Sequence, residues 1–192
     1  MADIGLQNLH IAKMTTEDTA TTAPVYDTPK RFVGVNSVEI DPEVETAILY
    51  GDNQALATIT KHKKSTITYE VADLSPEDQA LIFGRTYDTD TKTMFINKDD
   101  KAPYLAFAYE KNNHKGERIF YAFFKGKISP SQETANTEGE SLEFGLHNFS
   151  GEFVYRLDNG MMCAVKLVDS TDTTTTLVSW FTSVLAQRRI KK

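Results

Sequence analysis

Apolar and polar residues alternate along most of this chain, which is the two-residue period of a β-strand with one wet face. The clearest case is residues 66–71, where Ile67, Tyr69 and Val71 alternate with polar neighbours. A further strand is predicted over residues 6–14, and an extended stretch runs from residue 33 to residue 40. The pattern therefore predicts a mainly β fold.

The centre of the chain has the strongest strand pattern. Apolar residues alternate on both sides of the turn sequence at 112–116, at Leu105, Phe107 and Tyr109 before it and at Ile119, Tyr121 and Phe123 after it. This arrangement predicts a β-hairpin. Because Phe120 and Phe124 fall on the opposite face of the second strand, we expect core on one face and a helix or a neighbouring subunit on the other.

Alternation returns in the last third of the chain. Apolar residues alternate over 142–146 and again over 149–155, and an apolar stretch follows at 161–168. Asp158-Asn159-Gly160 supplies turn residues between the last two stretches. We therefore predict that these last two strands form a second hairpin.

Two helices interrupt the β pattern. Ser75 is a suitable N-cap, Pro76 suits the first helical position and Gly84 suits the end, so a short flanking helix is predicted over residues 76–83. Near the C-terminus, within residues 174–189, apolar residues recur at helical spacing at Leu177, Trp180, Phe181, Val184 and Leu185. This stripe predicts an amphipathic helix that closes the β core or docks against a neighbouring protomer.

Three polar stretches are candidate loops or arms: residues 15–29, 41–64 and 131–140. Within the second, residues 41–45 are expected to interrupt the preceding extended stretch, and Gly51-Asp52-Asn53 provides turn chemistry. Polar loops of this length in a compact domain are often functional. No linker divides the chain, so residues 1–192 are expected to form a single domain.

The net charge of the chain limits the kinds of function that the protein can have. The formal net charge is −6, which argues against a general grip on nucleic acid, because duplex binding depends on neutralising phosphates with Lys and Arg. A channel through which DNA slides is compatible with this charge, since its wall should repel phosphate. The first residues lack the pattern of a signal peptide, and no stretch approaches roughly 20 consecutive apolar residues, so we expect cytoplasmic synthesis and no membrane span.

The sequence offers no candidate catalytic, cofactor or metal site. Cys163 is the only cysteine, so an intrachain disulfide is impossible, and its apolar strand predicts a buried, inert thiol. The four histidines lack metal-ligand spacing. Pairs such as Glu39 with Asp41, or Glu138 with Glu140, are expected by composition in a chain with 27 acids.

Several strings along the chain resemble one known family. Residues 4–12 (IGLQNLHIA) and 26–29 (YDTP) are similar to the opening of the major tail, or tail tube, protein family of siphoviruses and related prophages. Later strings follow in the family's order at residues 72–74 (ADL), 104–109 (YLAFAY), 121–127 (YAFFKGK) and 180–182 (WFT). Together these strings span nearly the whole chain.

The resemblance implies a single-domain β-sandwich or half-open barrel that acts as a structural virion protein. Subunits of this family would close into a hexameric ring with a β-barrel lumen, and the rings would stack into the tail tube around a tape measure protein. Tail tip and tail terminator proteins would be further partners, and genomic DNA would pass through the lumen without specific binding. Neither cofactor nor catalysis is expected.

These expectations nominate residues for assembly. We hypothesise that some of Glu39, Asp41, Glu43 and Glu45 face the lumen or the contact between rings. The other candidates for inter-subunit or lumen positions are Glu133, Glu138, Glu140, Trp180 and Phe181.

Two other kinds of protein fit the same pattern. One is another β structural protein, such as a head-decoration subunit or a tube-like protein of a contractile injection system. The other is a β-sandwich binding module for carbohydrate or peptide, which would need an exposed aromatic platform. An enzyme would need a cleft of converging titratable groups.

Overall fold

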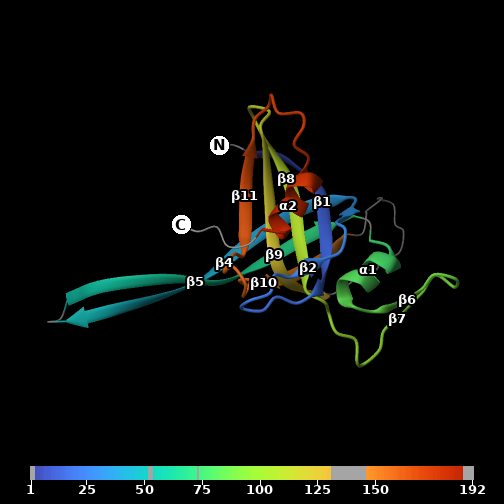
Figure 1. The fold of residues 1–192 in the computed structure, drawn as a ribbon, viewed down its shortest axis with the longest axis horizontal. Helices are drawn as coiled ribbons and strands as arrows, with labels where there is room; N and C mark the ends of the chain where they lie inside the picture. Colours follow the sequence, from blue (N-terminus) through green and yellow to red (C-terminus); the bar gives the residue numbers. More distant parts are fainter. Residues whose placement is uncertain (1–2, 52–53, 73, 131–145, 188–192) are drawn as a thin grey trace, which may run out of the picture.

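The computed structural model describes residues 3–51, 54–72, 74–130 and 146–187, and it consists mainly of antiparallel strands with two short helices (Figure 1). The predicted fold class is thereby confirmed. The strands are β1 (Asp3–Thr16), β2 (Val25–Tyr26), β3 (Lys30–Phe32), β4 (Val35–Gly51), β5 (Gln54–Val71), β6 (Thr86–Asp88), β7 (Thr93–Phe95), β8 (Leu105–Asn113), β9 (Arg118–Pro130), β10 (His147–Phe153) and β11 (Cys163–Val168). The helices are α1 (Pro76–Phe83) and α2 (Leu177–Leu185).

One large sheet contains nine of these strands in the order β2-β1-β8-β9-β10-β5-β4, with β3 also paired to β1 and β11 also paired to β9. Strands from distant parts of this order contribute to one hydrophobic core. Leu9 of β1, Phe107 of β8 and Ile67 of β5 are all fully buried in that cluster, so the sheet curls around it as a half-open barrel. Helix α1 adds Ile82 and Phe83 to the same core.

A second core lies on the opposite face of β8 and β9, where α2 packs (Figure 1). Phe120 and Phe124 point into it and are fully buried, which confirms that β9 is covered on both faces. The amphipathic helix is also confirmed, although it is shorter than the predicted 174–189. It begins after the N-cap Thr176, whose side chain forms a capping box with Ser179.

Helix α1 has the bounds that its capping residues predict. The Ser75 hydroxyl accepts a hydrogen bond from the Asp78 backbone N–H, and Gly84 ends the helix with a φ of 67°. A Cβ atom at position 84 would lie 2.1 Å from the Lys101 carbonyl oxygen, so the position requires glycine for space as well as for conformation.

The central hairpin is confirmed as β8 and β9, but the second predicted hairpin is wrong. Strands β10 and β11 both pair with β9, not with each other: Glu152 lies opposite Lys127, and Cys163 lies opposite Phe123. With 13 residues, β9 is long enough to pair with β10 along its C-terminal part and with β11 along its N-terminal part. Of the strand predicted over 142–146, all but residue 146 lies outside the described residues.

The predicted interruption at 41–45 is also wrong, because β4 continues through it and pairs with β5 as far as Gly51. Its acidic residues meet compatible side chains across the ladder, with Asp41 opposite Thr66 and Glu43 opposite Lys64. Pro42 is tolerated because β4 lies at the end of the strand order, where a missing N–H costs little. Figure 1 shows the distal part of this hairpin projecting from the body. We call residues 43–51 and 54–61 the arm.

Candidate assembly surfaces

A polar surface covers the outward side of four neighbouring strands, β9, β10, β5 and β4; we call it the wet face. One row across these strands reads Lys127, Glu152, Thr66 and Asp41, and the next reads Ser129, Ser150, Thr68 and Glu39. Every residue in these rows is exposed or half-buried. The alternate residues of the same strands, such as Ile67 and Phe153, point into the core.

The structure brings the nominated acids of β4 together on this surface. Glu39, Asp41, Glu43 and Glu45 occupy alternate positions of one strand, so they share the wet face, and all four are exposed. Glu70 and Glu152 of the neighbouring strands add further carboxylates. The wet face is therefore rich in negative charge.

The lysines of the wet face lie beside these acids. The Lys64 ammonium is 2.6 Å from Glu152 Oε1 and 3.5 Å from Glu43 Oε2, and the hydrogen bond to Glu152 raises the pKa of Lys64. Lys63 lies 3.0 Å from Glu45 Oε2. In the strand register Lys61 lies opposite Glu45 and Lys127 lies opposite Glu152, and the Lys127 ammonium lies 4.4 Å from the centre of the Tyr104 ring.

The arm exposes apolar side chains that the body does not cover. These are Val44, Ile48, Leu49, Tyr50, Leu56 and Ile59. A two-stranded hairpin that stands alone in water is marginally stable, and clustered exposed apolar residues mark contact surfaces. The outer edge of β4 also pairs with no other strand in the described part of the chain, so it is open to strand pairing. Arm and edge together form a candidate contact surface.

An apolar groove of about 450 Å³ lies at the base of the arm. Ile40, Pro42, Phe123, Met161, Met162 and Cys163 supply most of its lining. His62 lies at its margin, with Nδ1 2.8 Å from the Tyr155 hydroxyl and Nε2 3.1 Å from the Ser65 hydroxyl. The prediction that Cys163 is buried is wrong, because the odd-numbered side chains of β11 point outward; neighbouring atoms still raise the pKa of its thiol by desolvation.

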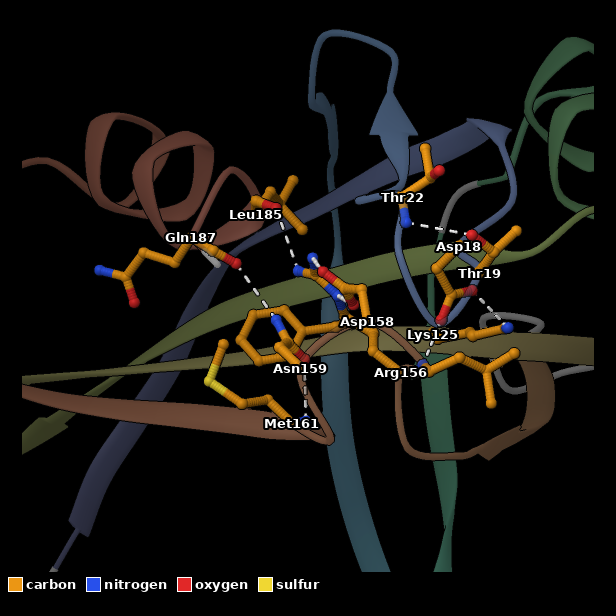
Figure 2. Close-up of polar contacts among 12 residues, drawn as sticks. Asp18, Thr19, Thr22, Lys125, Arg156, Asp158, Asn159, Met161, Leu185 and Gln187 are labelled. Atoms are coloured by element: carbon orange, nitrogen blue, oxygen red, sulfur yellow. Dashed lines mark hydrogen bonds and ion pairs between the residues drawn. The ribbon is translucent and has the colours of Figure 1, made fainter. Parts of the chain in front are cut away.

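A polar cluster that the sequence did not reveal joins the loop after β1 to the connection between β10 and β11 (Figure 2). The Asp18 carboxylate is fully buried and lies 2.5 Å from the Lys125 ammonium, and it also accepts a hydrogen bond from the Leu157 backbone N–H. Burial favours the neutral acid, but the hydrogen bonds from Lys125 and Leu157 outweigh this effect and hold the pKa of Asp18 below its usual value.

The same connection caps the end of α2 (Figure 2). Arg156 Nη1 donates to the Leu185 carbonyl at 3.0 Å, and Asn159 Nδ2 donates to the Gln187 carbonyl at 3.1 Å. The bond to Leu185 satisfies a carbonyl that the helix end leaves without an intrahelical partner, and the bond to Gln187 holds the residue that follows the C-cap Ala186. Asp158 binds the Arg156 guanidinium through two hydrogen bonds, of 2.9 and 2.7 Å, and so fixes its orientation.

The remaining nominated residues fall in different surroundings. Phe181 is fully buried between α2 and the sheet, and the half-buried Trp180 packs against Phe120 with ring centroids 5.7 Å apart. Glu133, Glu138 and Glu140 lie outside the described residues. Among the residues that the structure describes, no group of three or more His, Cys, Asp or Glu side chains could hold a metal ion. The described helices are also too short or too polar to cross a membrane.

A mainly β chain with a long open sheet edge and a protruding apolar arm has the kinds of surface through which structural proteins assemble. The family model for phage tail tube protein matches residues 3–144, and the chain belongs to this family. It is therefore a structural component of a phage tail, and it builds a tube by self-assembly. A comparison with curated proteins found no match to this chain.

Proposed function

We propose that this chain forms hexameric rings that stack into the tube of a siphovirus tail, the conduit for DNA delivery, and that the wet face lines the lumen. The observation that carries this proposal is one polar, acid-rich face continuing across four adjacent strands. On the same outward side, helix α2 covers the neighbouring β8 and part of β9, and the barrel interior is filled by core, so the wet face is the exposed polar part of that side. A hydrated wall of negative charge would let DNA pass because it repels phosphate.

The open edge of β4 and the arm would join the subunits. Closing a ring through sheet edges removes exposed edges, which otherwise favour aggregation. A head-to-tail contact that does not close within one ring extends into an open tube. In this proposal the lumen holds a tape measure protein, tail tip and tail terminator proteins bind the two ends, and subunits made in the host cytoplasm assemble without a cofactor.

Electron microscopy tests the assembly directly. The purified subunit is examined by negative stain and light scattering over a range of protein and salt concentrations, with and without tail-tip complexes as seeds. Hollow tubes of uniform diameter are expected. A subunit that stays monomeric and fails to extend seeded tubes would refute the proposal, and discrete rings that never extend or binding to capsids would favour a different virion role.

Substitutions in the arm test its role in these contacts. Leu49→Ser with Tyr50→Ser removes two exposed apolar side chains, each contributing about 1.5 to 3 kcal/mol when fully buried at an interface. Losing about 3 kcal/mol per contact would raise the concentration needed for tube formation on the order of a hundredfold. Phe95→Ser with Ile96→Ser is the control, since these residues are also exposed but lie by the β6–β7 ribbon on the opposite side of the body (Figure 1).

Thermal unfolding of both double variants completes the test. Because all four side chains are exposed, the unfolding midpoint should stay close to that of the unsubstituted subunit. Equal assembly by the arm variant and the unsubstituted chain would remove the arm from the proposed contacts.

A further inference from the structure

The wet face contains lysines, although cationic side chains are unfavourable on a surface along which DNA slides. Lys61, Lys63, Lys64 and Lys127 all lie on or beside it. A lysine that is free to bind phosphate releases counterions from DNA and so adds to affinity. If this face lines the lumen, each such contact would slow a sliding duplex, and many subunits would multiply the effect.

The geometry around Lys64 prevents this contact. Its ammonium lies between Glu152 of β10 and Glu43 of β4, the strands on either side of its own strand β5. A phosphate that approaches Lys64 therefore meets two carboxylates around one ammonium, a local net charge of −1. The approach is repelled although a cation is present.

Lys63 is held in a similar way by Glu45, at 3.0 Å. Stability gives little reason for such pairs, because exposed ion pairs contribute only about 0 to 1 kcal/mol. The side chains are exposed to between 31%, for Lys64, and 62%, for Glu45, so water and DNA can reach them. The geometry of the pairs bears on binding instead, because each carboxylate occupies a donor that a phosphate would use.

We propose that Glu43, Glu45 and Glu152 keep the wet-face lysines from binding DNA phosphate. This proposal rests on the proposed lumen position of the wet face. It assigns different roles to the acids of that face. Glu43, Glu45 and Glu152 neutralise particular lysines, whereas Glu39 and Asp41, which have no ion pair with any described residue, add only to the general negative charge.

A matched pair of double variants separates these roles. Glu43→Gln with Glu152→Gln removes two negative charges and releases Lys64. Glu39→Gln with Asp41→Asn removes the same charge from the same face but releases no lysine. All four side chains are exposed, so both variants should fold.

Binding of the full-length subunit to a short fluorescein-labelled DNA duplex is measured by anisotropy at several salt concentrations. The Glu43/Glu152 variant should bind at least about tenfold more tightly than the Glu39/Asp41 variant, and its affinity should fall with salt more steeply by about 0.9 per freed lysine on a log–log plot. Equal affinity of the two variants would overturn the proposal, because net charge alone would then explain the binding. Failure of the Glu43/Glu152 variant to bind would overturn it as well.

Tube formation by the same proteins distinguishes this proposal from the function on which it rests. If the unsubstituted chain extends tubes and the two variants differ in DNA binding, both proposals stand. If the unsubstituted chain neither forms nor extends tubes, the tube proposal fails regardless of the DNA result. The proposed role of Glu43, Glu45 and Glu152 in DNA passage then fails with it. If tubes form but the two variants bind DNA equally, only the proposed role of Glu43, Glu45 and Glu152 is overturned.

Discussion

The buried ion pair between Asp18 and Lys125 provides the sharpest test of how the loop after β1 is held. In the Asp18→Asn variant the amide oxygen can still accept from the Leu157 N–H, but the Lys125 ammonium, 7% exposed, loses its counter-charge. Leaving one partner of a buried pair uncompensated costs about 3 to 5 kcal/mol. Lys125 also lies 4.6 Å from the centre of the Tyr104 ring, an interaction that retains part of its stabilisation, so we expect about 3 kcal/mol.

Urea unfolding of the full-length subunit measures this loss. Trp180 is the only tryptophan and packs beside Phe120, so its fluorescence reports on the core under α2. The free energy of unfolding should fall with little change in the denaturant slope. Lys125→Met combined with Asp18→Asn should recover at least about 2 kcal/mol relative to Asp18→Asn alone, because neither buried charge is then left unpaired.

Lowering the pH should reproduce part of the stability loss that Asp18→Asn causes. The pKa of Asp18 in the fold lies below its usual value of 3.8, so its contribution to stability is complete above about pH 4 and is lost as the pH falls through the lower, folded value. The Asp18→Asn variant should lack this portion of the acid dependence. A loss below about 1 kcal/mol in Asp18→Asn, or no recovery in the double variant, would refute the reasoning.

Two further substitutions test the packing of the body. The Tyr69 hydroxyl is fully buried and has no hydrogen-bond partner among the described residues, so Tyr69→Phe should raise the free energy of unfolding by about 1 kcal/mol, and a measured loss in urea unfolding would indicate a partner for that hydroxyl. Gly84→Ala should destabilise the subunit by at least about 2 kcal/mol, because the new Cβ would clash with the Lys101 carbonyl and the backbone conformation there disfavours a side chain; a thermal midpoint close to that of the unsubstituted subunit would contradict this.

Elements with local signals could be predicted from the sequence. Helix α1 is specified by Ser75, Pro76 and Gly84, all within one short segment, and its bounds were predicted correctly. Alternation predicts residues 66–71 of β5, whose side chains sit between core and solvent, but the rest of β5 falls in the stretch expected to be a loop or arm. The central hairpin is predicted although β8 and β9 are buried on both faces, because a turn sequence separates its two apolar runs. Which strands pair with each other was harder to predict from the sequence. Alternation identifies a strand but not its neighbour, so the turn residues at 158–160 suggested a hairpin, although β10 and β11 both pair with β9.

The candidate surfaces were predictable to a similar extent. Spacing alone places Glu39, Asp41, Glu43 and Glu45 on one face once β4 is known to be a single strand. The pairing of Lys64 with Glu152 spans 88 residues, and the Lys125 bond to Asp18 spans 107, so no local pattern could reveal either. The polar residues at 41–45 predict a break, because a local pattern does not show the Thr66 and Lys64 side chains that lie opposite Asp41 and Glu43 in the strand pair.

The even-numbered positions of β4 show how one strand serves both the subunit and its assembly. Near the body, Val38 and Ile40 pack against the barrel core. Interrupted only by Thr46, the apolar positions continue outward to Val44, Ile48 and Tyr50, but there all three side chains are exposed. An apolar face that persists beyond the end of its own core loses stability unless other apolar atoms cover it. In a tube protein the neighbouring subunit would supply those atoms, so the apolar alternation past Pro42 itself supports the arm as the inter-subunit contact.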